Sequence, residues 1–131
     1  MRIPARATAF WAALAFTMLA PAAPLLAHVK LDASSPVAGT AATAPKAITL
    51  TFSQPVDKGT AAANIVMTAM PGMKDHGEMA IRNFTPGWSA DGKTLTLSLK
   101  KPLSAGSYEV RWQAAAADGH AMEGTVAFDV G

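Results

Sequence analysis

The chain has 131 residues, with 11 Lys and Arg against 9 Asp and Glu, and it contains no cysteine. Arg2 and Arg6, close to the start, account for the formal net charge of +2, so no basic patch argues for nucleic-acid binding. The absence of cysteine excludes disulfides, and any metal site must be built without thiolates.

Residues 1–27 have the pattern of a secretory signal. Arg2 and Arg6 provide a positive start, and residues 7–20 form an apolar run without charge. The run is shorter than the roughly 20 apolar residues that a membrane span requires. We therefore expect an exported protein whose mature chain has no membrane span.

Two cleavage positions are open. Cleavage after Ala27 would leave a chain that begins with His28 and has the size of one domain, residues 28–131. Ala20-Pro21-Ala22 fits the small-x-small pattern of a cleavage site better, and cutting there would leave five more residues before His28. The leader by itself does not decide between them.

Past the leader, apolar and polar residues alternate in short segments separated by turn residues, which is typical of half-buried strands. The first segment, 29–32, is closed by Ser34-Ser35-Pro36, and a loop is expected from there to Lys46. The second segment, 48–53, ends at Gln54-Pro55.

Further along, 64–67 is expected to form a strand, and 79–84 another that Pro86-Gly87 turns. Asp91-Gly92 is a hairpin signal. The remaining expected strands are 95–99, 108–114 and 126–130. About seven short strands and no helix predict an all-β fold, an immunoglobulin-like β-sandwich of one domain.

Residues 67–79, here called the methionine segment, carry a sulfur or an imidazole at every third position. These residues are Met67, Met70, Met73, His76 and Met79. Pro71 and Gly72 would break a helix, and a strand would place successive members on opposite faces, so we expect a loop. Thioether ligands select Cu(I) among the common biological metals, which predicts a Cu(I) site. The alternative is that flexible methionines fill irregular gaps beneath a loop.

A second set of candidate ligands lies near the two ends of the expected mature chain. Asp118 and His120 are two residues apart, so both can face one point from an extended chain. An Asp-Gly turn followed by an exposed histidine is the alternative. If His28 is the first residue, its amine and ring form a chelate, and the three residues provide an N,O set suited to tetragonal Cu(II).

Three separated stretches together resemble the CopC family of bacterial periplasmic copper-binding proteins, which serve copper resistance and homeostasis. The first is His28-Val29-Lys30-Leu31, followed by Ser34-Ser35-Pro36. The second is Met67-Thr68-Ala69-Met70-Pro71-Gly72-Met73, and the third is Ala117-Asp118-Gly119-His120. The resemblance covers essentially the whole expected mature chain and favours cleavage before His28. It implies a Greek-key β-sandwich or barrel with two copper sites near opposite ends.

By this resemblance, His28, Asp118 and His120 would bind Cu(II). The residues matching the Cu(I) site would be Met67, Met70, Met73, His76 and Met79. One departure is that Lys74 and Asp75 separate Met73 from His76, where the best-known members have a single residue. The departure puts the individual Cu(I) ligands in question rather than the site.

The function that the resemblance implies is a periplasmic copper carrier or buffer, monomeric and not an enzyme. Its partner would be a CopD-like inner-membrane copper transporter. One alternative is a copper oxidoreductase, because an N-terminal histidine with a second histidine resembles a histidine brace. The other is an immunoglobulin-like interaction module without a metal role. The sequence contains no pattern of a Ser-His-Asp triad, a phosphate loop or a cofactor fingerprint.

Overall fold

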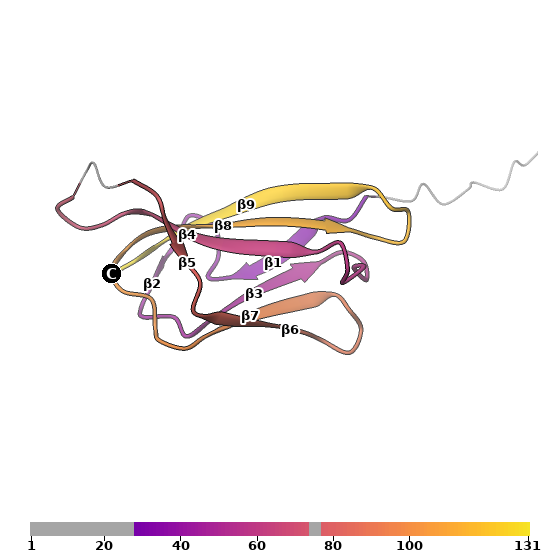
Figure 1. The fold of residues 1–131 in the computed structure, drawn as a ribbon, viewed down its shortest axis with the longest axis horizontal. Coiled ribbons are helices and arrows are strands. Elements are labelled where there is room, and N and C mark those ends of the chain that lie inside the picture. The colour runs from indigo at the N-terminus through magenta and orange to yellow at the C-terminus, as the bar shows by residue number, and fades with distance from the viewer. Residues whose placement is uncertain (1–27, 74–76) are drawn as a thin grey trace, which may run out of the picture.

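The computed structural model of the chain describes residues 28–73 and 77–131, and these residues form two β-sheets packed face to face (Figure 1). The strands are β1 (Leu31–Ser35), β2 (Ala41–Ala42), β3 (Ala47–Phe52), β4 (Ala62–Ala69), β5 (Met79–Ile81), β6 (Phe84–Trp88), β7 (Thr94–Leu99), β8 (Gly106–Ala115) and β9 (Ala121–Val130). The predicted all-β sandwich is confirmed. Across the described ranges, no helix has the length and hydrophobicity needed to cross a bilayer.

The two sheets have four and five strands. One sheet has the order β1-β3-β7-β6 and is antiparallel throughout. The other has the order β2-β9-β8-β4-β5, in which only the two-residue β2 runs parallel to its neighbour. The long hairpin of β8 and β9 lies inside this sheet, and its two strands pair from Gly106 opposite Val130 to Ala115 opposite Ala121.

The structure corrects the expected turn at Pro86-Gly87. Both residues lie within β6, where Pro86 is opposite Leu97 and Gly87 is opposite Thr96 of β7. β6 is the edge of its sheet, and an edge strand tolerates proline because the missing N–H can face away from the neighbouring strand. The single strand expected over 79–84 is instead two strands, β5 and β6, in different sheets.

Smaller differences occur at the start of the domain. The first strand includes Ser34 and Ser35, the serine pair that was expected to close it, and ends at Ser35. The expected loop to Lys46 includes β2, which pairs with the end of β9. The two ends of the methionine segment belong to β4 and β5 rather than to a loop, and Met70 to Met73 form a turn.

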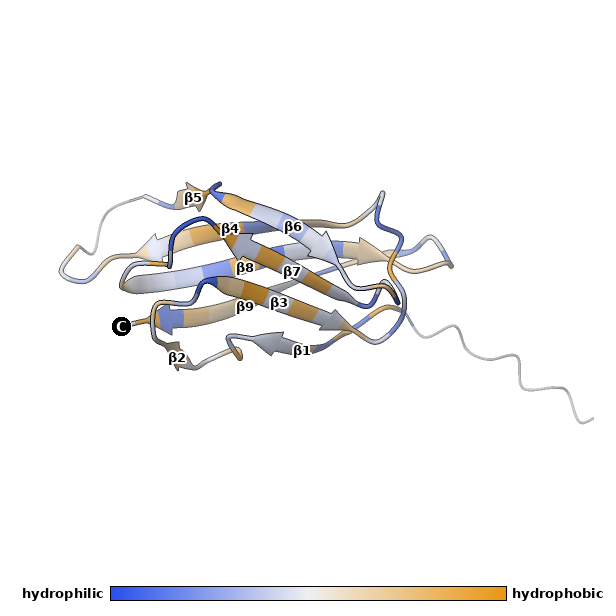
Figure 2. Ribbon diagram, turned by 90° about the horizontal axis from the view of Figure 1, so that it is seen from below, coloured by the Kyte–Doolittle hydropathy of each residue, from blue (hydrophilic) through white to orange (hydrophobic). Residues whose placement is uncertain are grey.

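The core lies between the sheets and follows the predicted alternation. Figure 2 shows apolar residues alternating with polar ones along β3 and β7. The aromatic side chains fill the centre, with Tyr108 stacked on Phe128 at 5.8 Å between ring centroids and Trp112 edge-on to Phe52 at 5.2 Å. The Tyr108 hydroxyl donates a hydrogen bond of 2.6 Å to the Ser104 carbonyl, so this buried polar group is satisfied.

Gly124 of β9 is required by the packing of Trp112. A Cβ atom added at Gly124 would lie 2.7 Å from the Trp112 ring. We therefore expect Gly124→Ala to lower the free energy of unfolding by about 1–3 kcal/mol, the usual effect of overpacking a core. Urea denaturation measures this difference. Gly87→Ala is the matched control, because its added Cβ has no neighbour closer than 4.0 Å, and it should change stability by no more than about 0.5 kcal/mol. Equal stabilities of the two variants would contradict the packing argument.

Candidate metal centre

Three residues from the two ends of the described chain meet at one end of the sandwich. The ligand atoms of His28, Asp118 and His120 all lie within 4.8 Å of one another, and we call these residues the His–Asp–His cluster. His28 Nδ1 lies 3.3 Å from Asp118 Oδ2, and His120 Nδ1 lies 3.9 Å from the same oxygen. The two imidazole rings are tilted by 49° with centroids 5.2 Å apart. One carboxylate oxygen thus faces two imidazole nitrogens.

A tight turn between β8 and β9 positions Asp118. The Gly119 N–H donates a 3.0 Å hydrogen bond to the Ala116 carbonyl, and Gly119 has a φ of +77°, which glycine adopts without steric penalty. The His120 N–H donates to Asp118 Oδ1 at 3.0 Å, which leaves Oδ2 facing the imidazoles. Asp118 and His120 are therefore brought together by a turn rather than by an extended chain.

His28 is held by the residues that follow it. The Val29 side chain is fully buried in the core. The next residue pairs with the end of β3, because the Lys30 N–H donates to Ser53 Oγ at 2.9 Å and the Ser53 N–H donates to the Lys30 carbonyl at 2.8 Å. This anchorage fixes the backbone of residue 28 beside the β8–β9 turn.

The charge at the site comes from Asp118. Its side chain is only 9 % exposed, whereas both imidazoles are open to solvent. Its pKa lies below the ordinary value, chiefly because the carboxylate accepts the His120 backbone N–H, with a further contribution from the hydrogen bond with His28; partial burial acts in the opposite direction. An ionised carboxylate beneath two accessible imidazoles suits a borderline metal ion such as Cu(II) or Zn(II).

Two methionines of the methionine segment face each other across a β-turn. The Met73 N–H donates to the Met70 carbonyl at 3.1 Å, and the two residues form an antiparallel bridge. Between them, Pro71 and Gly72, with a φ of +76° at the glycine, form a type II turn. Residues opposite each other in such a bridge place their side chains on the same side. The turn therefore presents two exposed thioethers together.

The other two described methionines of the segment lie in paired strands. Met67 of β4 is directly opposite Met79 of β5, but Met67 is only 4 % exposed and belongs to the core, whereas Met79 is 50 % exposed. Met67 thus has less support as a ligand than the three exposed methionines. His76, with Lys74 and Asp75, lies outside the described residues.

The two candidate sites lie at opposite ends of the sandwich. Figure 1 shows the β8–β9 turn and the start of the described chain at one end, and the connection between β4 and β5 at the other. The β8–β9 hairpin runs between the two ends over ten residues in each strand.

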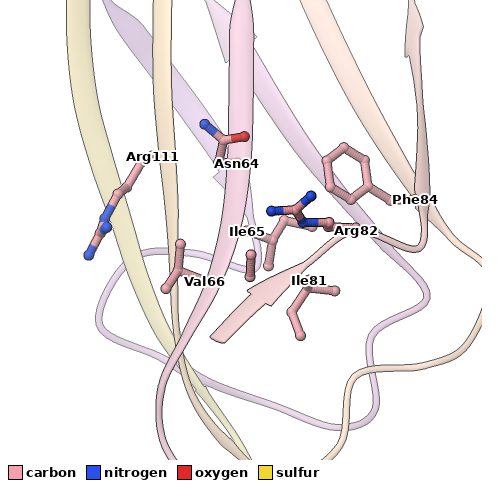
Figure 3. A pocket seen from close by; sticks show the side chains of 8 residues that line it. Asn64, Ile65, Val66, Ile81, Arg82, Phe84 and Arg111 are labelled. Atoms are coloured by element: carbon pink, nitrogen blue, oxygen red, sulfur yellow. The ribbon is translucent and has the colours of Figure 1, made fainter. Parts of the chain in front are cut away.

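One surface pocket of the described residues lies at neither site. It lies beside β4 and β5 and is lined by Asn64, Ile65, Val66, Ala80, Ile81, Arg82, Phe84 and Arg111. In Figure 3, the Arg82 and Arg111 side chains lie on opposite sides of β4. No imidazole, thioether or carboxylate lines this pocket, so its chemistry does not suit a copper ion.

Sequence reasoning missed one interaction next to the methionine segment. Arg111 of β8 makes two hydrogen bonds to the Glu78 carboxylate, Nη2–Oε1 at 2.7 Å and Nη1–Oε2 at 3.1 Å. Glu78 directly precedes Met79, and the opposite charges were the only available signal. The two residues are 33 positions apart, and no local pattern pairs them.

The fold and the site together define a small β-sandwich protein with a candidate metal-binding cluster at one end and a methionine-rich turn at the other. The chain belongs to the CopC family: the family model described as the CopC domain matches residues 31–131. The matched range includes Asp118, His120 and the methionine segment and begins three residues after His28. The resemblance to this family is confirmed.

Relatives and solved structures agree with this assignment. The chain is 41 % identical to copper resistance protein C of Pseudomonas syringae pv. tomato over 104 residues, covering 79 % of this chain and 81 % of the relative. It is 37 % identical to copper resistance protein C of Escherichia coli over 106 residues, covering 80 % and 82 %.

Among solved structures, the crystal structure of PcoC, a copper resistance protein from Escherichia coli, matches with a TM-score of 0.72 and 34 % identity. That match covers 78 % of this chain and 99 % of the other. CopC from Methylosinus trichosporium OB3b matches with a TM-score of 0.62 and 28 % identity, covering 79 % and 93 %. The fold of the described residues is thus that of structurally known members of the family.

Proposed function

We propose that this CopC-family protein is a periplasmic copper carrier or buffer that binds Cu(II) at the His–Asp–His cluster. The observation that carries the proposal is the convergence of two imidazoles and one ionised carboxylate within 4.8 Å on an accessible surface. Cleavage after Ala27 would add the α-amine of His28 as a further nitrogen donor. Amine, two imidazoles and a carboxylate complete a tetragonal Cu(II) set without an additional ligand.

The second part of the proposal is a Cu(I) site in the methionine segment. Its support is the type II turn that presents Met70 and Met73 on one side, together with the exposed Met79 in the returning strand. Thioethers are soft ligands that prefer Cu(I) to Cu(II). His76 belongs to the proposed ligand set on the resemblance alone.

The proposed role is carriage rather than catalysis. Copper oxidation chemistry requires a coordination position open to a substrate. In the proposed Cu(II) site, the Asp118 carboxylate faces both imidazoles and would occupy a position of its own. The partner proposed to exchange copper with this protein is a CopD-like transporter of the inner membrane.

The test is a copper titration of protein exported and processed by a bacterial host, with intact mass to establish the first residue. We expect the protein to bind one equivalent of Cu(II) and to retain it against a competing chelator. The EPR spectrum should be that of a tetragonal Cu(II) ion with several nitrogen ligands. Anaerobic titration with a Cu(I)-selective chromophoric chelator should show one Cu(I) bound as well. Weak or multiple Cu(II) binding by a chain that begins at His28 would overturn the Cu(II) site. Catalytic turnover of ascorbate and peroxide by the Cu(II)-loaded protein would favour the oxidoreductase alternative.

Cu(II) affinity should fall as the pH is lowered from 8 to 5. Imidazole and amine must be deprotonated to bind, so each protonated ligand nitrogen weakens binding by roughly tenfold per pH unit. The lowered pKa of Asp118 keeps its carboxylate ionised throughout this range, and its contribution is lost only when the pH falls below the ordinary carboxyl range. Chelator competition at several pH values measures the profile. Asp118→Asn is the control: it should bind more weakly at every pH, with the same slope between pH 8 and 5. A flatter slope in this variant would show that Asp118 titrates within the range.

A further inference from the structure

The strand that carries Met79 has few contacts of its own. β5 has three residues and, among the described strands, pairs only with β4, where Ile65, Val66 and Met67 are its register partners. Its first two residues are exposed, and only Ile81 packs against the core. A strand this short at the edge of a sheet is weakly held by its own pairing.

An arginine from beyond the neighbouring strand holds the start of β5. In the sheet order β8-β4-β5, Arg111 of β8 reaches past β4 and binds the Glu78 carboxylate with both of its terminal nitrogens. A bidentate arginine–carboxylate pair fixes position and orientation, which a lysine cannot do to the same degree.

Arg111 is itself held by a second carboxylate, that of Glu109. Its Nε and Nη2 donate to Glu109 Oε2 at 3.0 and 2.9 Å, so the guanidinium lies between two carboxylates. The pKa of Glu78 is lowered, first by the hydrogen bond from Arg111 and then by the charge of Arg111. Both members are exposed, so the pair contributes little to global stability; its effect is local to the start of β5.

We propose that Arg111 is a positioning residue for the Cu(I) site. By binding Glu78, Arg111 keeps β5 in register with β4. Met79 then stays opposite Met67, near the end of β4 that leads into the Met70–Met73 turn. This inference rests on the proposed Cu(I) function of the methionine segment. Without the Arg111–Glu78 ion pair, Met79 must become ordered when the metal binds. The free-energy cost of that ordering makes the binding free energy of Cu(I) less favourable.

The test compares Arg111→Gln with the unchanged protein by anaerobic Cu(I) competition. We expect Arg111→Gln to bind Cu(I) about two- to fivefold more weakly, the effect of losing one exposed ion pair, with unchanged Cu(II) affinity at the opposite end. The matched control is Arg82→Gln, which removes the same charge beside the other end of β5 and should leave Cu(I) affinity unchanged. Glu78→Gln, which removes the other member of the pair, should weaken Cu(I) binding to the same extent as Arg111→Gln.

A salt titration shows whether Arg111→Gln weakens Cu(I) binding through loss of the ion pair or through a general loss of structure. Ion pairs are screened as the ionic strength rises, because the Debye length falls from about 8 Å at 0.15 M to about 3 Å at 1 M. Raising sodium perchlorate should therefore weaken Cu(I) binding in the unchanged protein and leave Arg111→Gln unaffected. Equal Cu(I) affinities of the two proteins at low salt would overturn the inference while leaving the Cu(I) site intact. Absence of Cu(I) binding by the unchanged protein would instead overturn the proposed function.

Discussion

A chain that begins at Ala23 should bind Cu(II) roughly 10²–10⁴-fold more weakly than a chain that begins at His28. The two proteins correspond to the two cleavage positions and differ only in five residues of the leader. In the shorter chain, the amine and imidazole of one residue bind the metal as a chelate, which makes the second bond intramolecular and raises its effective concentration. In the longer chain, the nitrogen of residue 28 is a peptide nitrogen.

The measurement is chelator competition on both proteins, with EPR to count the nitrogen ligands. The longer chain should lose one nitrogen from the EPR spectrum as well as the affinity. Cu(I) binding serves as the internal control, because the methionine segment lies at the opposite end of the sandwich and should respond to neither change. Equal Cu(II) affinities would show that the amine is not a ligand and that the His–Asp–His cluster is sufficient.

Replacing both turn methionines should have the largest effect on Cu(I). We expect Met70→Leu with Met73→Leu to weaken Cu(I) binding by roughly a hundredfold or more, because the turn holds the two thioethers on one side and both donors of that chelate are lost. Leucine keeps the apolar character of the side chains, and both positions are exposed, so stability should change by no more than about 0.5 kcal/mol. Anaerobic competition gives the affinity, and X-ray absorption gives the number of sulfur ligands.

Two single variants serve as controls for that result. Met122→Leu, in the part of β9 near the His–Asp–His cluster, should not change Cu(I) affinity. Met67→Leu should change it by no more than about threefold, because its thioether is buried in the core and replacement by leucine is volume-conserving. A loss in Met67→Leu as large as in the double variant would make Met67 a ligand and would show that the buried side chain turns outward to bind.

The fold could be predicted where the pattern is local. Strands such as β3, β7 and β8 alternate clearly because one face of each is buried against the other sheet. The assignment of Pro86-Gly87 to a turn was wrong because the pair has turn chemistry, and only its position in an edge strand makes it acceptable there. β2 could not be predicted, since two residues form a strand only by pairing with the end of β9.

The same holds for the candidate sites: contacts between residues close in sequence could be predicted, and contacts between distant residues could not. Asp118 and His120 are close in sequence, so their convergence was predictable. His28 is far from them in the sequence; it was grouped with them on its donor chemistry and on the family resemblance, and no local pattern predicts its approach. The pair of Arg111 and Glu78 depends on three neighbouring strands and leaves no local pattern. The burial of Met67 was within reach of the sequence, because Ile65 and Met67 lie on the same face of a strand.

The placement of the two proposed sites determines how copper can travel. At about 3.4 Å per residue, the ten-residue strands β8 and β9 separate the ends of the sandwich by roughly 30 Å. No ligand can serve both metals over that span, and a well-packed core offers an ion no route between them. An ion that changes site must therefore first leave the protein. A molecule that exchanges copper at one proposed site would not compete for the same surface with a molecule that exchanges copper at the other.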